Sequence, residues 1–259
     1  HELKHYDMRS SLGRNFSDSE KLGAAMGFIT SVYDGKDLIW LGHFKGINCF
    51  NIRTNSFIEL KDINKRLNGR SCYSLMKDSH NNIWIGTSSG LFLYDSKTKL
   101  IKEYSTANGL SNEVISGICE DSRHQIWCST YYGITKLDPQ SGKCLNFFIQ
   151  DGLQGNEYTY GAYYKDKSGL IYFGGTNGLT RFNPDLIQES RRHLRLQITN
   201  FYLYNNQPVN TRTKSGSHFV IQQSVLKNEV YSLAHSDNTF TIEFSTMDFS
   251  NPERIIYEY

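Results

Sequence analysis

The sequence predicts an all-β protein in which four β-propeller blades are followed by a partial immunoglobulin-like β-sandwich. Two observations predict the blades: a motif of about 44 residues occurs four times, and each copy contains several short apolar runs separated by turn residues. A third observation predicts the sandwich, because after residue 187 the repeats stop and apolar residues alternate with polar ones. Since four blades are at the small end of the range for propellers, we expect them to belong to a larger propeller.

Four markers keep their spacing in every copy of the motif. An aspartate precedes an aromatic residue by six positions, a turn glycine follows that aromatic residue by six, and an Asn or Asp follows the glycine by five. Steps of 44, 43 and 45 residues separate the successive aromatic residues, which we expect to pack between neighbouring blades. The markers are Asp34, Trp40, Gly46 and Asn51; Asp78, Trp84, Gly90 and Asp95; Asp121, Trp127, Gly133 and Asp138; and Asp166, Tyr172, Gly178 and Asn183.

The third copy shows the expected strands most clearly, and from the innermost to the outermost they read EVISGICED, QIWCST, GITKLD and CLNFFIQ. Inner strands of a propeller are covered on both faces, which explains their nearly continuous apolar runs. Asp121 lies in the first turn, where an Asx side chain binds the backbone that follows it. Gly133 ends the second turn, where a left-handed backbone favours glycine. No window of a dozen residues keeps a 3.6-residue period without a glycine or a turn cluster, so we expect no helix.

The markers also set the expected domain boundaries. The propeller region is expected to cover residues 1–187, and the sandwich region residues 191–259, where the short length and the alternating pattern indicate only part of a sandwich. Residues 2–6 (ELKHY) are similar to residues 100–104 (LIKEY), so residues 1–6 are expected to form an outermost strand. This strand belongs either to a preceding blade or to the fourth blade, which it would complete. The four blades are expected near residues 27–66, 70–105, 112–150 and 157–187.

Composition argues against several classes of function. The 28 basic and 26 acidic residues nearly balance without forming a basic stripe, so we expect no nucleic-acid partner. No run of about 18 apolar residues occurs, so we expect no membrane contact by this chain. The five cysteines include no CxxC pair, and Cys72, Cys119 and Cys128 are expected to be buried. His1 and His5 are the one HxxxH pair among the eight histidines and no HxH pair occurs, so we expect no metal and no cofactor.

Longer stretches resemble a known family. DSHNNIWIGTSSGLFLYD and DKSGLIYFGGTNGLTRFNPD resemble the two-component regulator propeller repeat, and LQITNFYLYNNQPV with LAHSDNTFTIEFSTMDFSNPERIIYEY resembles the start of a Y_Y_Y domain. Together they are similar to the periplasmic sensor region of hybrid two-component system histidine kinases. The resemblance implies a periplasmic, non-enzymatic sensor of oligosaccharides that controls glycan-utilisation genes. It also implies a parent protein anchored in the inner membrane, carrying the kinase and dimerising through the sandwich.

A ligand is expected on the propeller face that displays two sets of loops, the turns between second and third strands and the segments that join successive blades. Tyr131 and Tyr132 stand out because two adjacent aromatic residues in one turn cannot both point into a core. Sugars stack their C–H faces on aromatic rings, and their hydroxyl groups bind amides, carboxylates and guanidinium groups. The candidate ligand-binding residues are His43, Phe44, Lys45, Arg70, Asn112, Glu113, Tyr131, Tyr132, Asn156, Glu157, Tyr158 and Asn177.

Two other functions stay open at this point. A protein-interaction or dimerisation scaffold is compatible with sensing, since the same disc and sandwich would bind a partner. A propeller enzyme acting on polysaccharide requires converging acid, base or metal groups. Glu113 and Glu157 recur at equivalent positions between blades, but no His or Lys recurs with them, so we expect no catalytic residues.

Overall fold

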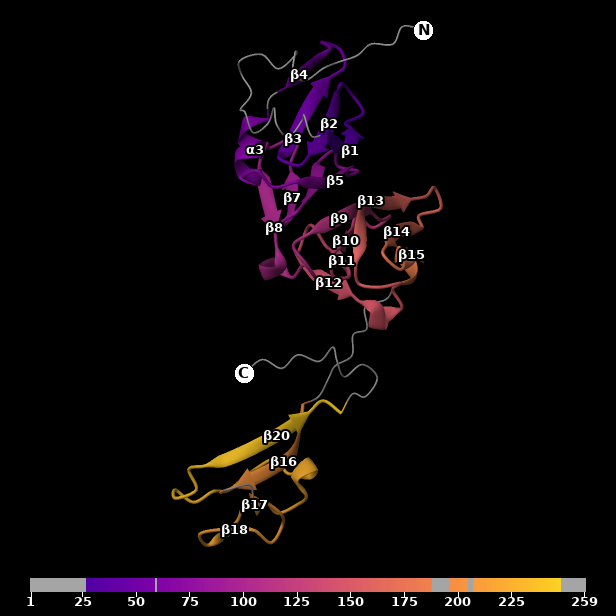
Figure 1. Cartoon of the computed structure of the whole chain (residues 1–259). Helices are drawn as coiled ribbons and strands as arrows, with labels where there is room; N and C mark the ends of the chain where they lie inside the picture. The colour runs from indigo at the N-terminus through magenta and orange to yellow at the C-terminus, as the bar shows by residue number, and fades with distance from the viewer. Residues whose placement is uncertain (1–26, 59, 188–195, 205–206, 248–259) are drawn as a thin grey trace. The chain divides into compact units, whose positions relative to one another are not determined.

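The fold was determined as a computed structural model, which describes residues 27–58, 60–187, 196–204 and 207–247 (Figure 1). The chain divides into two compact units, residues 1–188 and 189–259. The expected outermost strand at residues 1–6 and the last residues of the expected sandwich, 248–259, lie outside the described residues.

The first unit contains antiparallel sheets in which consecutive strands are neighbours, as the repeats predict. Three of the sheets in the described part have four strands each, so the all-β propeller fold is confirmed. Their strands are β1 Phe28–Tyr33, β2 Leu38–His43, β3 Gly46–Asn51 and β4 Ser56–Ile58; β5 Cys72–Lys77, β6 Ile83–Thr87, β7 Leu91–Tyr94 and β8 Ile101–Tyr104; and β9 Ile115–Glu120, β10 Ile126–Thr130, β11 Ile134–Leu137 and β12 Cys144–Phe147.

The fourth sheet has three strands among the described residues, β13 Tyr158–Lys165, β14 Ile171–Gly175 and β15 Gly178–Phe182. The chain then leaves the sheet through the 3-10 turn Pro184–Leu186, where the Asn183 side chain accepts a hydrogen bond from the Asp185 backbone N–H. The first strands of successive sheets contact one another, β1 with β5, β5 with β9 and β9 with β13. This is the arrangement of consecutive propeller blades around an axis.

The expectation of no helix is wrong at one place. Helix α3, Lys61–Leu67, lies between the first and second blades and buries Ile63 and Leu67. The Asn64 amide holds it against β3, because Asn64 Nδ2 donates to the Ile47 carbonyl at 2.8 Å and Asn64 Oδ1 accepts from the Ile47 N–H at 3.0 Å. A helix of seven residues is too short to show a helical period in a window of a dozen residues. Since an isolated helix of this length is not stable in water, its contacts with the blades stabilise it. Two 3-10 turns, Thr106–Asn108 and Ile149–Asp151, occupy the later junctions.

The three tryptophans pack between blades, as expected. Trp40 packs with residues of the first and second blades, Trp84 with residues of the second and third, and Trp127 with residues of the third and fourth. Trp84 and Trp127 are almost completely buried. Tyr172 is half-buried and touches Tyr164 instead, at 6.2 Å between ring centroids. The expected packing of the repeated aromatic residue between blades is therefore confirmed for the three tryptophans.

The six-residue spacing from aspartate to aromatic residue has a specific cause. Asp78 and Asp121 each accept backbone N–H groups of the following turn through Oδ1, and each accepts the indole Nε1–H of the tryptophan through Oδ2, at 3.0 and 2.9 Å. Asp166 accepts the Tyr172 hydroxyl at 3.0 Å in the same way. The expected turn role of the aspartates is confirmed, and in these blades the same side chain also fixes the aromatic ring.

A bulge interrupts the first strand of every described blade. In β5 the register passes from Cys72–Thr87 to Ser74–Gly86, so two steps on β5 match one on β6, and β1 and β9 show the same offset. In β13 it passes from Tyr158–Gly175 to Tyr163–Phe173, so five steps match two. A bulge re-aims side chains and disrupts pairing locally. The blade nearest the second unit in sequence thus has the largest bulge.

The second unit is built around β16 Gln197–Leu203, which pairs with β17 Gln207–Pro208 on one side and with β20 Phe240–Ser245 on the other. Strands β18 Lys214–Ser215 and β19 His218–Phe219 form a separate hairpin, and Val225–Lys227 is a 3-10 turn. A small core unites these elements: Phe201, Leu203, Val209, Val220 and Ile221. Its assignment as the start of a Y_Y_Y sandwich stays a prediction.

Candidate functional site

The two predicted sets of loops do lie on one face of the first unit, because their backbones bind one another. Gly90 N–H donates to the Glu113 carbonyl at 2.7 Å, and Gly133 N–H donates to the Asn156 carbonyl at 2.6 Å. Tyr131 N–H donates to the Val114 carbonyl, in the segment that enters its own blade. The second turns of blades two and three therefore rest on the segments that enter the next blade. Gly133 has φ +88°, as the turn requires, and an added Cβ there would meet the Phe147 carbonyl at 2.4 Å.

Four candidates in these loops have structural hydrogen bonds. Glu113 accepts the N–H and the hydroxyl of Thr106, Asn112 accepts the Val114 N–H, and Asn156 accepts the Ile149 N–H. Arg70 pairs with Glu103 at 2.7 Å and lies over the Phe92 ring at 5.1 Å. These contacts hold the loop backbone in place and leave little of each side chain for a ligand.

Two further candidates are buried, which the sequence did not indicate. His43 has no exposed surface; its Nδ1 accepts the Lys45 N–H at 3.1 Å and its ring lies edge-on to Phe28. Tyr158 is 1% exposed and shares a 2.8 Å hydrogen bond with the Thr180 hydroxyl. Both side chains belong to the packing between strands, so neither is presented to solvent.

The remaining candidates lie nearer the surface: Phe44 is half-buried, and Lys45, Tyr131, Tyr132, Glu157 and Asn177 are exposed. Tyr131 and Tyr132 are 41% and 52% exposed, in agreement with the expectation that adjacent turn aromatics cannot both enter a core. Tyr132 packs on Phe148 at 5.3 Å between ring centroids. Partial burial raises the pKa of Tyr131, and the nearby Tyr73, Tyr160 and Glu157 raise it further.

Tyr73 and Tyr160 complete an aromatic cluster that sequence reasoning missed. Their rings stack at 5.1 Å with an interplanar angle of 19°, although β5 and β13 belong to the second and fourth blades. Tyr73 is the bulge residue of β5, and Tyr160 lies in the enlarged bulge of β13 beside Gly161, which has φ +78°. We name Tyr73, Tyr131 and Tyr160 the tyrosine cluster. The bulges in the first strands could have indicated this cluster, but the pairing register that defines a bulge is not visible in one sequence.

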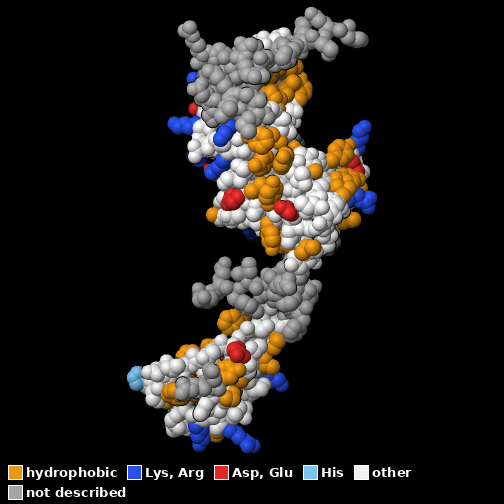
Figure 2. Space-filling model, in the orientation of Figure 1, with side chains coloured by type: hydrophobic (Ala, Val, Ile, Leu, Met, Phe, Trp, Pro, Cys, Tyr) orange, Lys and Arg blue, Asp and Glu red, His pale blue; other side chains and the backbone are white. Residues whose placement is uncertain are grey.

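Charge around these loops is mixed. Figure 2 shows Lys and Arg side chains separated from one another on the visible face of the first unit, with hydrophobic side chains between them. Glu157, which is exposed, lies close enough to Tyr131 for its charge to act on that phenol. An aromatic surface with a neighbouring carboxylate suits a neutral polyhydroxylated ligand better than a polyanion.

Comparison with known proteins agrees with this architecture. Residues 66–89 and 109–132 match the family described as "Two component regulator propeller". These two segments are therefore similar to that family of repeats. Each matched segment covers a junction, the first hairpin of a blade and the start of its second turn, so the second and third of the repeats recognised by spacing are the matched units.

The longer relatives are a histidine kinase and the extracellular domains of two hybrid two component systems. The chain is 25% identical over 237 residues to histidine kinase P4 of Formosa agariphila, which aligns with 89% of this chain and 17% of that protein. It is similar to the solved extracellular domain of the hybrid two component system BT3049 of B. thetaiotaomicron, with a TM-score of 0.68 and 22% identity over 96% of this chain and 32% of that one. The corresponding domain of BT4673 has a TM-score of 0.53 and 16% identity over 76% of this chain and 29% of that one.

The chain thus spans less than a third of the length of each of these three proteins. The solved domains share its fold. Among the residues that the structure describes, no helix is long and apolar enough to cross a membrane.

Proposed function

We propose that this chain is an extracytoplasmic ligand-sensing part of a hybrid two-component sensor, and that the tyrosine cluster binds an oligosaccharide. The carrying observation is the stacking of Tyr73 on Tyr160 at the loop face, with Tyr131 beside them. The repeat family and the fold shared with extracellular domains support the sensor role.

The geometry of the cluster suits a sugar ring. Tyr160 is 42% exposed and Tyr131 is 41% exposed, so each offers ring surface to a ligand while Tyr73 supports Tyr160 from behind. Aromatic faces stack on sugar C–H groups, and phenol hydroxyls and the Glu157 carboxylate bind sugar hydroxyls. Because the rings come from blades two, three and four, a ligand contacting all of them would also bias how these blades pack.

The arrangement favours binding over catalysis. Glu113, one of the two recurring carboxylates, is bound by the Thr106 N–H and hydroxyl at 2.8 and 2.6 Å, so it is held as a loop cap. In the proposed parent protein the chain lies in the periplasm, the second unit passes the signal towards an inner-membrane anchor, and a kinase elsewhere controls glycan-utilisation genes.

Calorimetric titration with a panel of neutral oligosaccharides tests the proposal. We expect Tyr160→Ala and Tyr131→Ala to weaken binding of the responsive sugar at least tenfold. Tyr164→Ala is the matched control, since Tyr164 is 62% exposed on the same strand but contacts Tyr172 instead. Undiminished binding in both cluster variants, or binding of a peptide with no sugar bound, would refute the assignment.

A second candidate, a dimerisation scaffold, is favoured by strand β20 of the second unit. Phe240, Ile242 and Phe244 are 48%, 40% and 40% exposed. They lie at alternate positions, so they share one face of the strand, as in an apolar surface that a second copy would cover. Light scattering tests this: Ile242→Ser should convert a dimer into a monomer, and a wild-type chain that is monomeric at high concentration would exclude it.

A further inference from the structure

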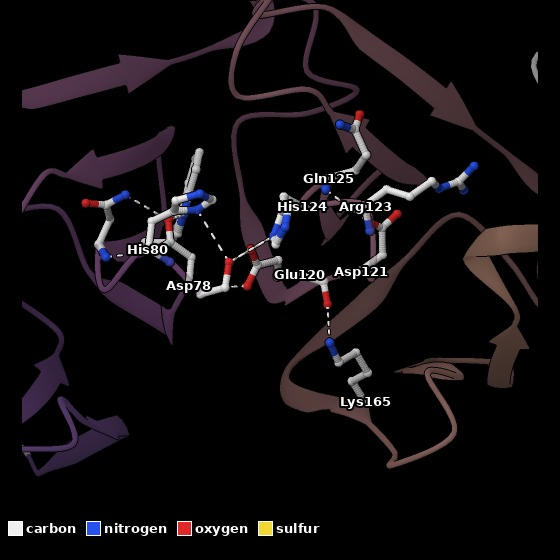
Figure 3. Close-up of polar contacts among 11 residues, drawn as sticks. Asp78, His80, Glu120, Asp121, Arg123, His124, Gln125 and Lys165 are labelled. Atoms are coloured by element: carbon white, nitrogen blue, oxygen red, sulfur yellow. Dashed lines mark hydrogen bonds and ion pairs between the residues drawn. The ribbon is translucent and has the colours of Figure 1, made fainter.

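A second group of chemically active side chains lies at the first hairpin turns of blades two and three. His80 comes from the turn between β5 and β6, Glu120 ends β9, and His124 comes from the turn between β9 and β10 (Figure 3). One ligand atom from each residue lies within 4.8 Å of the others. The two imidazole rings meet edge to face at 5.0 Å between centroids.

Glu120 differs from its equivalents in the two neighbouring blades. The residue before the turn aspartate is Lys77 in blade two and Lys165 in blade four, and each donates its Nζ to a carbonyl of the preceding blade, at Asp34 and Glu120. In blade three the same position is a carboxylate that reaches back to blade two. There Glu120 accepts the Ser79 N–H at 2.8 Å and the Ser79 hydroxyl at 2.6 Å. The charge is thus reversed at the junction that contains the two histidines.

The carboxylate and the imidazoles are already brought together by hydrogen bonds. His124 Nδ1 lies 3.0 Å from Glu120 Oε1 and 2.9 Å from the Ser79 hydroxyl. His80 Nδ1 lies 3.4 Å from the same hydroxyl. In a tetrahedral zinc site with bonds of about 2.1 Å, ligand atoms are about 3.4 Å apart, so small rotations of the exposed rings suffice.

Space and charge around the group also suit a hydrated cation. A cavity of about 310 Å³ is lined by these three residues together with Asp138 and Gln140. Arg123 also lines it, but its guanidinium group pairs with Asp185 at 3.6 Å and donates to the Pro184 carbonyl. Lys165 binds the main-chain oxygen of Glu120 and not its carboxylate. Figure 3 shows the Arg123 side chain directed away from the imidazoles, and the Lys165 Nζ directed at Glu120, whose main-chain oxygen it binds.

We propose that His80, Glu120 and His124 form a binding site for a divalent transition-metal ion of the zinc class, which links blade two to blade three. Two imidazoles and one carboxylate are a ligand set that zinc accepts, with a fourth position for water. The Ser79 hydroxyl would remain as an outer partner that orients the ligands. The ion joins turns 40 residues apart in sequence, so it stabilises the folded first unit. The site is separate from the tyrosine cluster and does not depend on sugar binding.

The test is titration of the metal-stripped chain with zinc chloride, with cobalt absorption as a report of ligand geometry. We expect one equivalent of zinc to bind, and His80→Ala, His124→Ala and Glu120→Gln each to weaken it at least tenfold. Zinc should raise the melting temperature of the wild type and not that of these variants. His235→Ala, exposed in the second unit, and His5→Ala, near the amino terminus, are the matched controls and should bind as the wild type does.

Circular dichroism establishes that each variant is folded before titration. Zinc binding that survives in His80→Ala and His124→Ala, or that disappears in His5→Ala, would overturn the proposal. Absence of binding to the folded wild type would do the same. Oligosaccharide binding by the Glu120→Gln variant should be unchanged, so failure of this site and failure of the sugar site are distinguishable.

Discussion

The energy of the hydrogen bond between a turn aspartate and the tryptophan six residues later can be measured by comparing two blades of the same chain. Trp127 donates its Nε1–H to Asp121 at 2.9 Å, and both side chains are buried. Trp40 occupies the equivalent position in blade one, also buried, but its Nε1 has no hydrogen-bond partner among the described residues. Substitution of each tryptophan by phenylalanine removes the same N–H group from two environments.

The expected magnitude follows from the two environments. A hydrogen bond to a charged group contributes about 1.5–3 kcal/mol, whereas removal of an unpaired buried N–H relieves a desolvation cost. Both variants lose comparable ring volume, and both rings pack on aromatic neighbours, Trp127 on Phe147 and Phe182 and Trp40 on Tyr94. We therefore expect Trp127→Phe to lower the free energy of unfolding by about 2 kcal/mol more than Trp40→Phe.

Urea unfolding provides the assay. All three tryptophans lie in the first unit, so the fluorescence of the two that remain in each variant reports on that unit. The comparison needs equal urea dependence of the two variants, since a changed slope would mean a changed unfolded state. If the two variants are destabilised equally, within about 0.5 kcal/mol, the bond to aspartate contributes nothing beyond packing and the reasoning fails.

Three further predictions concern packing, thiols and pH. Gly117→Ala should lower the free energy of unfolding by about 1–3 kcal/mol, because the added Cβ would lie 2.6 Å from the Cβ of Tyr163. Urea titration measures this, and a neutral effect would mean that strand β13 shifts to make room. Cys72 is completely buried and burial raises its pKa, so a thiol reagent should label the half-buried Cys144 first and Cys72 only on unfolding, as peptide mapping would show. The Ser168 hydroxyl lowers the pKa of Asp166, so this carboxylate stabilises the fold above its unfolded pKa of about 3.9, and the stabilisation is lost as pH falls through the lower folded pKa. Asp166→Asn should therefore make the free energy of unfolding depend less on pH in acid. An unchanged pH dependence in acid would contradict the assignment.

Local chemistry accounts for what could be predicted from the sequence. The turn aspartates, the glycines at positive φ and the apolar runs act within a few residues of one another, so their spacing alone identifies the strands, the turns and the period of the blade. The burial of Trp84 and Trp127 follows from the same repeat, because large apolar side chains fill the space between blades whose strands are covered on both faces. The loop face was predictable for the same reason, since strand order fixes which turns share an edge.

Only the tertiary structure decided which side chains meet. Tyr73 and Tyr160 stack because two bulges of different size aim them at each other, and bulges depend on the pairing partner rather than on the strand itself. His43 and Tyr158, which are candidates by position, are buried because the neighbouring strands cover them. His80, Glu120 and His124 come from two blades, so no spacing within one motif reveals them. Sequence sets what each blade is, whereas contacts between blades depend on the angle and register at which whole sheets pack.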